Sequence, residues 1–310
     1  MCATPAVDVS DDLGDVSRGL AGAGLAVCAW STGTVIAKHI DMGGLAIGAY
    51  RFIIFAVAIV VWMWLRKQPM SWRAFRASTW GGIALGADIA LFFTAVKETS
   101  IVNATIIGSL QPVVVGVIAA RFFGEHIRGR DALWSLVAIA GVFVVVLSGP
   151  DTGDQSLRGD LLAAAAMFSW SAYFIASKES RRRITSTEFT AGTAIWTALI
   201  CTPLAVAVGQ DMSMPSAASW GWLLAMTVGS GIVGHVLMNW SLVRIPLWVG
   251  STFTLLIPVF SALLAWGFLG EAITPAQAAA MCVVIASLGR IVHDQRRQVT
   301  AEIATEEVVT

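Results

Sequence analysis

The chain has 310 residues, of which 56% are hydrophobic and 13% are charged, and its formal net charge is zero. Soluble domains usually carry about 25% charged residues. This composition, with a mean hydropathy of +0.75, excludes an ordinary soluble domain and favours a polytopic membrane protein. The balanced charge also argues against a nucleic-acid partner.

Ten apolar segments follow one another along the chain, and charged residues bound most of them. Each is about long enough to cross a hydrocarbon layer of ~30 Å as a helix. An acidic tail, residues 1–17, precedes them, and a loose polar tail, residues 293–310, is expected after them. We expect the spans at residues 19–37, 43–65, 77–96, 99–120, 132–150, 161–177, 189–208, 220–243, 245–270 and 272–289.

The fourth span recurs in the ninth. Residues 104–125 align with residues 250–271, and seven of the 22 positions are identical. The matches include a proline in the middle of the helix, Pro112 and Pro258, and a terminal Gly-Glu pair. Two apolar helices can agree by composition, but a matched proline and a matched Gly-Glu indicate an internal repeat.

The repeat extends to the rest of each half. At an offset of 140 residues, Trp30 falls on Trp170 and Lys38 on Lys178. We therefore expect a first five-helix repeat at residues 18–150 and a second at residues 158–292. Because five is odd, the second repeat is inverted in the membrane. Inverted repeats place a binding site near the membrane midplane and give alternating access when one half rocks against the other.

The distribution of positive charge predicts the orientation. The chain has 20 Lys and Arg residues. When the ten spans alternate, Arg51 lies inside the second span, Lys38, Lys97 and Arg158 lie on one side, and the other sixteen lie opposite. Basic residues gather on the cytoplasmic side, so both termini are expected in the cytoplasm.

These repeated residues resemble the drug/metabolite transporter superfamily, in particular its ten-helix EamA-type members. The resemblance covers residues 18–290. It is carried by Ala29-Trp30-Ser31, Arg51-Phe52, Gln111-Pro112, Phe123-Gly124-Glu125, Gly159-Asp160-Leu161-Leu162, Ser169-Trp170-Ser171, Ile257-Pro258 and Leu269-Gly270-Glu271.

The resemblance implies a secondary transporter of the cytoplasmic membrane, commonly an exporter of amino acids, metabolites or drugs. It further implies that spans 1–4 and 6–9 surround a central cavity and that spans 5 and 10 lie at the periphery. Four-helix relatives use a glutamate in their first helix. Spans 1 and 6 contain no carboxylate here, so that drug/proton mechanism does not carry over.

Asp88 is the foremost candidate for a functional residue because it lies near the middle of the third span. An isolated carboxylate at that depth costs about 2.5–3.5 kcal/mol, so it should face a cavity or a partner. Proton coupling and recognition of a substrate ammonium group are the functional interpretations. A structural Asp, hydrogen-bonded to a neighbouring helix, is the alternative.

His235 lies at nearly the depth that the repeat assigns to Asp88, and the two could form a proton-transfer pair. A histidine that caps a helix contact or faces water is the alternative. Neither residue is accompanied by further ligands at metal-binding spacing, so we expect no metal and no cofactor.

Two tryptophans, Trp30 and Trp170, lie near the middle of spans 1 and 6, although tryptophan usually favours the membrane interface. They are candidates for cavity walls that stack on a substrate, together with Tyr173 and Phe92, which follow Trp170 and Asp88 by one helical turn. The alternative is that these rings fill space between helices.

Two amides and the two prolines complete the candidate site. Asn239 lies one turn after His235 on the same helical face, and Gln111 precedes Pro112. A proline frees the carbonyl one turn earlier and loosens the helix, so Pro112 and Pro258 are candidate hinges. Static kinks are the alternative.

Arg51 lies about a third of the way into the second span. Its side chain can extend to the membrane surface, which favours an anchoring role over contact with an anion. Glu125 and Glu271 end their helices at opposite faces, where we expect them to contact neighbouring loops.

The sequence thus predicts an all-α secondary transporter that exports a small organic metabolite, such as an amino acid or a drug-like compound, by alternating access. Its partners are the substrate, a proton and the lipid bilayer, in the form of a monomer or homodimer in the bacterial inner membrane. A non-coupled facilitator or channel-like permease for small neutral solutes is the alternative. No GxSxG, HExxH or paired-carboxylate motif occurs, which argues against an enzyme.

Overall fold

The computed structural model describes residues 9–149, 156–180 and 182–309, and all regular elements within these ranges are helices. The elements are α1 (Val9–Ala37), α2 (Gly44–Leu65), α3 (Trp72–Ala77), α4 (Thr79–Glu98), α5 (Ile101–Gly108), α6 (Gln111–Phe122), α7 (Gly129–Leu147), α8 (Leu157–Ser180), α9 (Ser186–Ala207), α10 (Ala217–Met226), the π-helix η1 (Thr227–Val233), α11 (Gly234–Ser241), α12 (Leu247–Phe253), α13 (Leu256–Leu269) and α14 (Pro275–Val309).

Ten membrane-crossing helices are formed from these elements, as predicted. Seven spans are single helices, whereas the fourth, eighth and ninth are each divided. The fourth consists of α5 and α6, the eighth of α10, η1 and α11, and the ninth of α12 and α13. The short helix α3 lies between spans 2 and 3. The expected all-α fold is therefore confirmed.

The tails differ from the expected loose segments. Helix α1 already begins at Val9 and α14 continues to Val309, whereas residues 1–8 lie outside the described part of the chain. The continuation of α14 has a physical cause. The side chain of Asp294 is fully buried, and ion pairs join it to Arg130 (2.8 Å) and Arg290 (3.4 Å). The helix therefore packs against α7 beyond the expected end of the span.

The two spans that share the repeated proline break just before it, whereas α9 (Ser186–Ala207) stays continuous around Pro203. Helix α5 ends at Gly108 and α6 begins at Gln111, directly before Pro112. Helix α12 ends at Phe253 and α13 begins at Leu256, two residues before Pro258. The missing proline N–H removes a helical hydrogen bond at each place. The breaks are thus located as expected, while their use as hinges stays a prediction.

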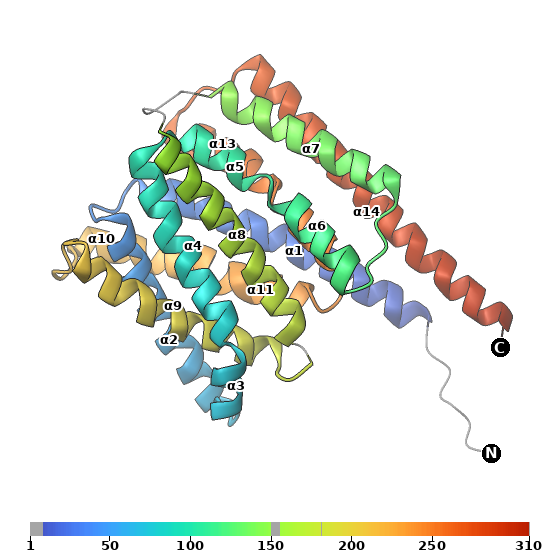
Figure 1. Cartoon of the computed structure of the whole chain (residues 1–310), viewed down its shortest axis with the longest axis horizontal. Coiled ribbons are helices and arrows are strands. Elements are labelled where there is room, and N and C mark those ends of the chain that lie inside the picture. The colour runs from blue at the N-terminus through green and yellow to red at the C-terminus, as the bar shows by residue number, and fades with distance from the viewer. Residues whose placement is uncertain (1–8, 150–155, 181, 310) are drawn as a thin grey trace.

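Spans 1 and 6 pack on the opposite repeat (Figure 1). Helix α8 packs on α4, α5 and α6, and we call these four helices the first bundle. Helix α1 packs on α10, η1, α11, α12 and α13, and we call these six elements the second bundle. The two sets are equivalent under the internal repeat. Each bundle therefore combines spans 3 and 4, or 8 and 9, with a helix from the other half.

The remaining long helices form two pairs. Helices α7 and α14 run side by side along one edge of the molecule (Figure 1) and pack mainly on each other. Helix α2 packs on α9. Each pair joins equivalent spans of the two repeats, which are spans 5 and 10 or spans 2 and 7. Spans 5 and 10 thus lie at the periphery, as the family resemblance implies.

Candidate functional site

The two equivalent tryptophans meet where the bundles face each other. The ring centroids of Trp30 in α1 and Trp170 in α8 are 5.1 Å apart, in an edge-to-face arrangement. Aromatic pairs of this geometry contribute about 0.5–1.5 kcal/mol beyond the burial of their area. The Trp30 indole also packs directly on the backbone of Gly234 in α11. A Cβ atom at this position would lie 2.5 Å from the indole ring, so the packing requires a glycine there.

His235 lies in the middle of an aromatic cluster. Its ring is 5.4 Å from Trp30, 6.3 Å from Trp170 and 5.8 Å from Tyr173, measured between centroids. Phe52 and Phe55 of α2 contact it from another side. The His235 side chain is buried, and its Nδ1 lies 3.2 Å from the Tyr173 hydroxyl. Among the described residues, no hydrogen bond links His235 to Asp88, so the expected Asp–His pair is not formed in this conformation.

Asn239 connects three helices behind this cluster. Its Nδ2 donates to the hydroxyls of Tyr173 (2.8 Å) and Thr190 (3.0 Å), and its Oδ1 accepts from Ser177 (2.7 Å). Both Asn239 and Tyr173 are fully buried. We call Tyr173, Ser177, Thr190, His235 and Asn239 the buried polar network. In this conformation, the polar groups of Asn239 and Tyr173 are bonded to protein partners, so these two residues have a positioning role.

Asp88 faces Arg51 instead. The two groups lie close enough to interact electrostatically, and both interact with Cys201 of α9. No N···O distance of 4.0 Å or less joins Asp88 and Arg51 in the described structure, so they do not form a direct ion pair. The two groups therefore interact electrostatically without direct contact, within a membrane-spanning region.

Arg51 does not have the anchoring role that its position favoured. Its side chain is only partly exposed, its Nε is buried, and its guanidinium lies 5.0 Å from the centroid of the Phe52 ring. The depth of a residue within a span does not fix the direction of its side chain. The Arg51 side chain is held inside the molecule because Asp88 and the Phe52 ring offer favourable electrostatic partners there.

Span 8 contains an element that the sequence analysis missed. The π-helix η1 packs against α1 and α2, and Gly231 within it lies beside the Nε of Arg51. π-Helices are rare and occur frequently at functional sites. The three glycines of this stretch, Gly229, Gly231 and Gly234, are a signal that could have indicated irregular backbone.

The breaks of spans 4 and 9 contact each other. Gln111, at the start of α6, accepts a hydrogen bond of 3.0 Å through its Oε1 from the Thr254 hydroxyl, which follows α12. The Gln111 side chain is buried, and its Nε2 has no partner among the described residues. The indole N–H of Trp30 and the Nε of Arg51 are likewise buried without a partner. A buried N–H group without a partner costs about 1–3 kcal/mol, so these three groups are available donors.

Phe92 is set apart from this group. Its side chain is 38% exposed, and its described ring contact is to Phe93, with a centroid distance of 6.2 Å. Two of the surface pockets of the described structure, of about 280 and 290 Å³, are lined by other residues than Asp88, Arg51 and His235. Among the described residues, no three potential metal ligands gather. The central aromatic side chains contact one another in this conformation.

Comparisons with known proteins agree with this architecture. The family model described as "EamA-like transporter family" matches residues 17–147 and 157–292. The threonine/homoserine exporter RhtA of Escherichia coli K12 is 26% identical over 212 residues, which cover 66% of this chain and 67% of that protein. An uncharacterized transporter of Bacillus subtilis, YwfM, is 26% identical over 280 residues, covering 88% of this chain and 93% of that one.

A known crystal structure superposes on this chain with a TM-score of 0.77 at 20% sequence identity. It covers 91% of this chain and 99% of the other. This likeness supports the fold. The chain is therefore similar to membrane transporters in its sequence and to a solved protein in its architecture.

Proposed function

The chain belongs to the EamA-like transporter family, and from this premise we propose that it is a proton-coupled exporter of small amino acids in the bacterial inner membrane. That it is a multi-pass membrane transporter follows from its ten apolar helices and its transporter relatives. The direction, the substrate and the coupling are the proposal. A relative named as a threonine/homoserine exporter supports the choice of substrate class.

The observation that carries the proposal is the separated pair of charges, Arg51 and Asp88. An amino acid has a carboxylate and an ammonium group on one carbon atom. A guanidinium can bind the carboxylate through two parallel hydrogen bonds, and a carboxylate can bind the ammonium group. Since the two side chains interact electrostatically without a direct ion pair, each can give its free groups to a ligand between them.

The surroundings of these charges suit a small, partly apolar side chain. Phe52 lies against Arg51, and the Trp30–Trp170 pair lies at the interface of the bundles. The unpartnered N–H groups of Trp30 and Gln111 offer two further donors. One Arg and one Asp, both only partly exposed, balance a zwitterion, whereas a polyanion such as a nucleotide sugar would leave an excess of negative charge. A zwitterion therefore fits better.

Asp88 also supplies a route to coupling. A carboxylate that binds either a proton or an ammonium group, but not both together, makes their movements mutually dependent. Protonation would release the amino acid on the side where protons are abundant, and deprotonation would allow the next one to bind on the opposite side. This exchange gives export driven by the inward proton gradient.

The test is counterflow and gradient-driven transport in proteoliposomes, with labelled threonine and homoserine and a panel of other amino acids and metabolites. The variants are Asp88→Asn and the matched control Asp211→Asn, which changes an exposed loop residue. We expect the wild type and the control to accumulate an amino acid when a pH gradient is imposed. Asp88→Asn should lose at least about tenfold of this accumulation, as the loss of a charged hydrogen bond implies.

Two results would contradict the proposal. If no amino acid on the panel exchanges but another solute does, the substrate class is wrong. If the wild type merely equilibrates the amino acid and Asp88→Asn behaves alike, the protein is a facilitator and Asp88 has a structural role.

A further inference from the structure

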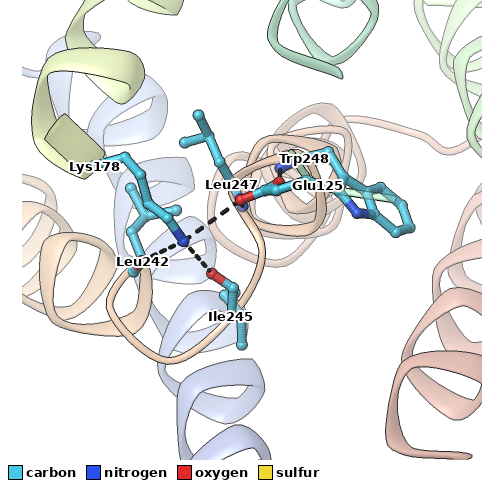
Figure 2. Close-up of polar contacts among 6 residues, drawn as sticks. All are labelled: Glu125, Lys178, Leu242, Ile245, Leu247 and Trp248. Atoms are coloured by element: carbon cyan, nitrogen blue, oxygen red, sulfur yellow. Dashed lines mark hydrogen bonds and ion pairs between the residues drawn. The ribbon is translucent and has the colours of Figure 1, made fainter. Parts of the chain in front are cut away.

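At one end of the molecule, a lysine and a glutamate of the first bundle grip the turn between α11 and α12 in the second bundle. Figure 2 shows this contact. Glu125 accepts hydrogen bonds from the backbone N–H groups of Leu247 (2.7 Å) and Trp248 (3.1 Å). Lys178 lies 3.4 Å from Glu125 and donates to the carbonyl oxygens of Ile245 (3.3 Å) and Leu242 (3.5 Å).

This contact fastens the two bundles to each other. Glu125 follows α6 and Lys178 lies in α8, so both belong to the first bundle, whereas all four of their backbone partners belong to the second. Helix α12 has Pro246 at its N-cap and no side-chain cap of its own. The carboxylate of Glu125 therefore satisfies N–H groups that would otherwise lack a partner. The side chains of Lys178 and Glu125 are only 25% and 11% exposed.

The internal repeat supplies a second pair of the same kind. Lys38 and Glu271 occupy the positions equivalent to Lys178 and Glu125, and they form an ion pair in the second bundle. Both glutamates follow a glycine in the left-handed conformation, with φ of 66° at Gly124 and 70° at Gly270. Their backbone N–H groups bond to equivalent carbonyls, Ala119 (3.2 Å) and Ala265 (3.3 Å). The same backbone motif therefore positions both carboxylates.

The two pairs lie at opposite ends of the fold. Gly19 of α1 packs against Arg244 and Ile245, beside the carbonyls that Lys178 binds. Lys38 directly follows the other end of α1. About 19 residues of helix separate these points, which corresponds to ~28 Å, nearly the thickness of the hydrocarbon layer.

The Lys38–Glu271 pair does not bind the equivalent turn of the first bundle in this conformation. Its target would be residues 96–102, equivalent to the turn that holds Glu125 and Lys178. Among the described residues, neither Lys38 nor Glu271 has a hydrogen bond to this segment, and Ser100 caps α5 instead through a bond of 3.0 Å from the Asn103 N–H. The two side chains are 58% and 43% exposed, and a pocket of about 290 Å³ lies beside Glu271.

We propose that these Lys–Glu pairs are the two latches of alternating access, and that they close in turn. The Lys178–Glu125 latch is closed on the second bundle here, and the Lys38–Glu271 latch is open. Rocking of the bundles releases Glu125 from the start of α12 and brings Glu271 to the start of α5. The inference rests on the proposed transport function, because latches of this kind require a path that opens at either end. With both termini in the cytoplasm, the present conformation opens outward.

The experiment measures the two ends separately, by distances between pairs of spin labels on protein in lipid nanodiscs. The four native cysteines are replaced first. One label pair replaces Arg182, which follows α8, and Val243, which lies in the turn that Lys178 of α8 contacts. The other replaces Lys97 and Ala272 at the open latch. All four positions are exposed.

We expect Glu125→Gln to lengthen the Arg182/Val243 distance and to shorten the Lys97/Ala272 distance, because release at one end permits closure at the other. Lys178→Met should shift both distances in the same directions but less, since Glu125 keeps its two backbone donors. Glu271→Gln is the matched control. It should leave both resting distances unchanged, because its latch is already open.

Unchanged distances in Glu125→Gln would overturn the proposal, and so would lengthening at both ends, which indicates a loosened fold rather than an exchange of latches. The readout needs no substrate and is thus separate from the transport assay. If the distances exchange while no amino acid is moved, the latches stand and the proposed function fails. If amino acids are exported while Glu125→Gln leaves the distances unchanged, the function stands and the latches fail.

Discussion

The two ends of the molecule have equivalent backbone structures but differ in their side chains. At the end where Lys178 and Glu125 close, the buried polar network also joins α8 to α9 and α11. At the other end, the residues equivalent to Tyr173, Ser177, His235 and Asn239 are Gly33, Ala37, Ile89 and Phe93. None of these four has a polar side chain, so these four residues cannot form the hydrogen bonds of the network.

This difference shows how a symmetrical backbone can favour one conformation. If the two repeats were identical, the inward-open and outward-open conformations would have the same free energy, and neither would be favoured. Three hydrogen bonds by Asn239 and two by Glu125 stabilise closure at one end. The other end relies on an exposed ion pair, which typically contributes about 0–1 kcal/mol. The closed network end should therefore be the resting arrangement.

The largest effect is expected from breaking the network at Asn239. Asn239→Ala removes the partner of three buried hydroxyl groups, and we expect a loss of about 2–3 kcal/mol in the free energy of unfolding. The measurement is unfolding in mixed detergent micelles containing increasing amounts of sodium dodecyl sulfate. Asn103→Ala is the matched control near the other end, because Asp160 keeps its 2.7 Å bond from Thr99 when the Asn103 contact is lost. Equal losses in the two variants would contradict the asymmetry of the ends.

A smaller effect is expected where Gly234 lets Trp30 approach. The Cβ of Gly234→Ala would lie 2.5 Å from the Trp30 indole, so the ring must move away from Trp170. We expect a net loss of about 1 kcal/mol, since overpacking costs more than the gain in helix propensity returns. Gly221→Ala lies in the same span with nothing within 4 Å of its Cβ position, and it should be neutral or stabilising. The same detergent titration compares them, and a neutral Gly234→Ala would show that the indole is free to shift.

The smallest effect compares two ion pairs near the ends of α1 and α8. Arg244 bonds to Asp15 (3.2 Å) and stacks on Trp240 with only 22% of its side chain exposed. Arg158 pairs with Glu98 at 3.1 Å but is 80% exposed. We expect Arg244→Gln to cost about 1 kcal/mol through the lost cation–π contact and ion pair. Arg158→Gln should cost less than about 0.5 kcal/mol, and the reverse order in thermal unfolding would contradict the account.

Much of the fold follows from the sequence because membrane crossing imposes length and hydropathy on each span. The matched prolines likewise placed the breaks of spans 4 and 9, because the missing N–H removes a helical hydrogen bond, although α9 stays helical around Pro203. The candidate side chains were harder to assign. The structure brings Trp30, Trp170 and His235 together, whereas the partners of Asp88 and Asn239 depend on which helices face each other.

Four features could not be read from the residues alone. The direction of the Arg51 side chain depends on Asp88 and Phe52 of the folded molecule. The exchange of α1 and α8 between the bundles depends on tertiary packing, and so does the grip of Glu125 on α12. The helical end of α14 depends on the burial of Asp294 beside Arg130. Each arises from contacts between segments far apart in the chain.

The most direct test of the central claim is whether binding of an amino acid displaces a proton from Asp88. The purified protein is titrated with threonine or homoserine in weakly buffered detergent solution containing a pH indicator, with Asp88→Asn in parallel. The account predicts that proton release by the wild type saturates together with binding, and that Asp88→Asn releases none. Tight binding without proton release, or equal release by Asp88→Asn, would contradict the claim that proton and substrate share this carboxylate.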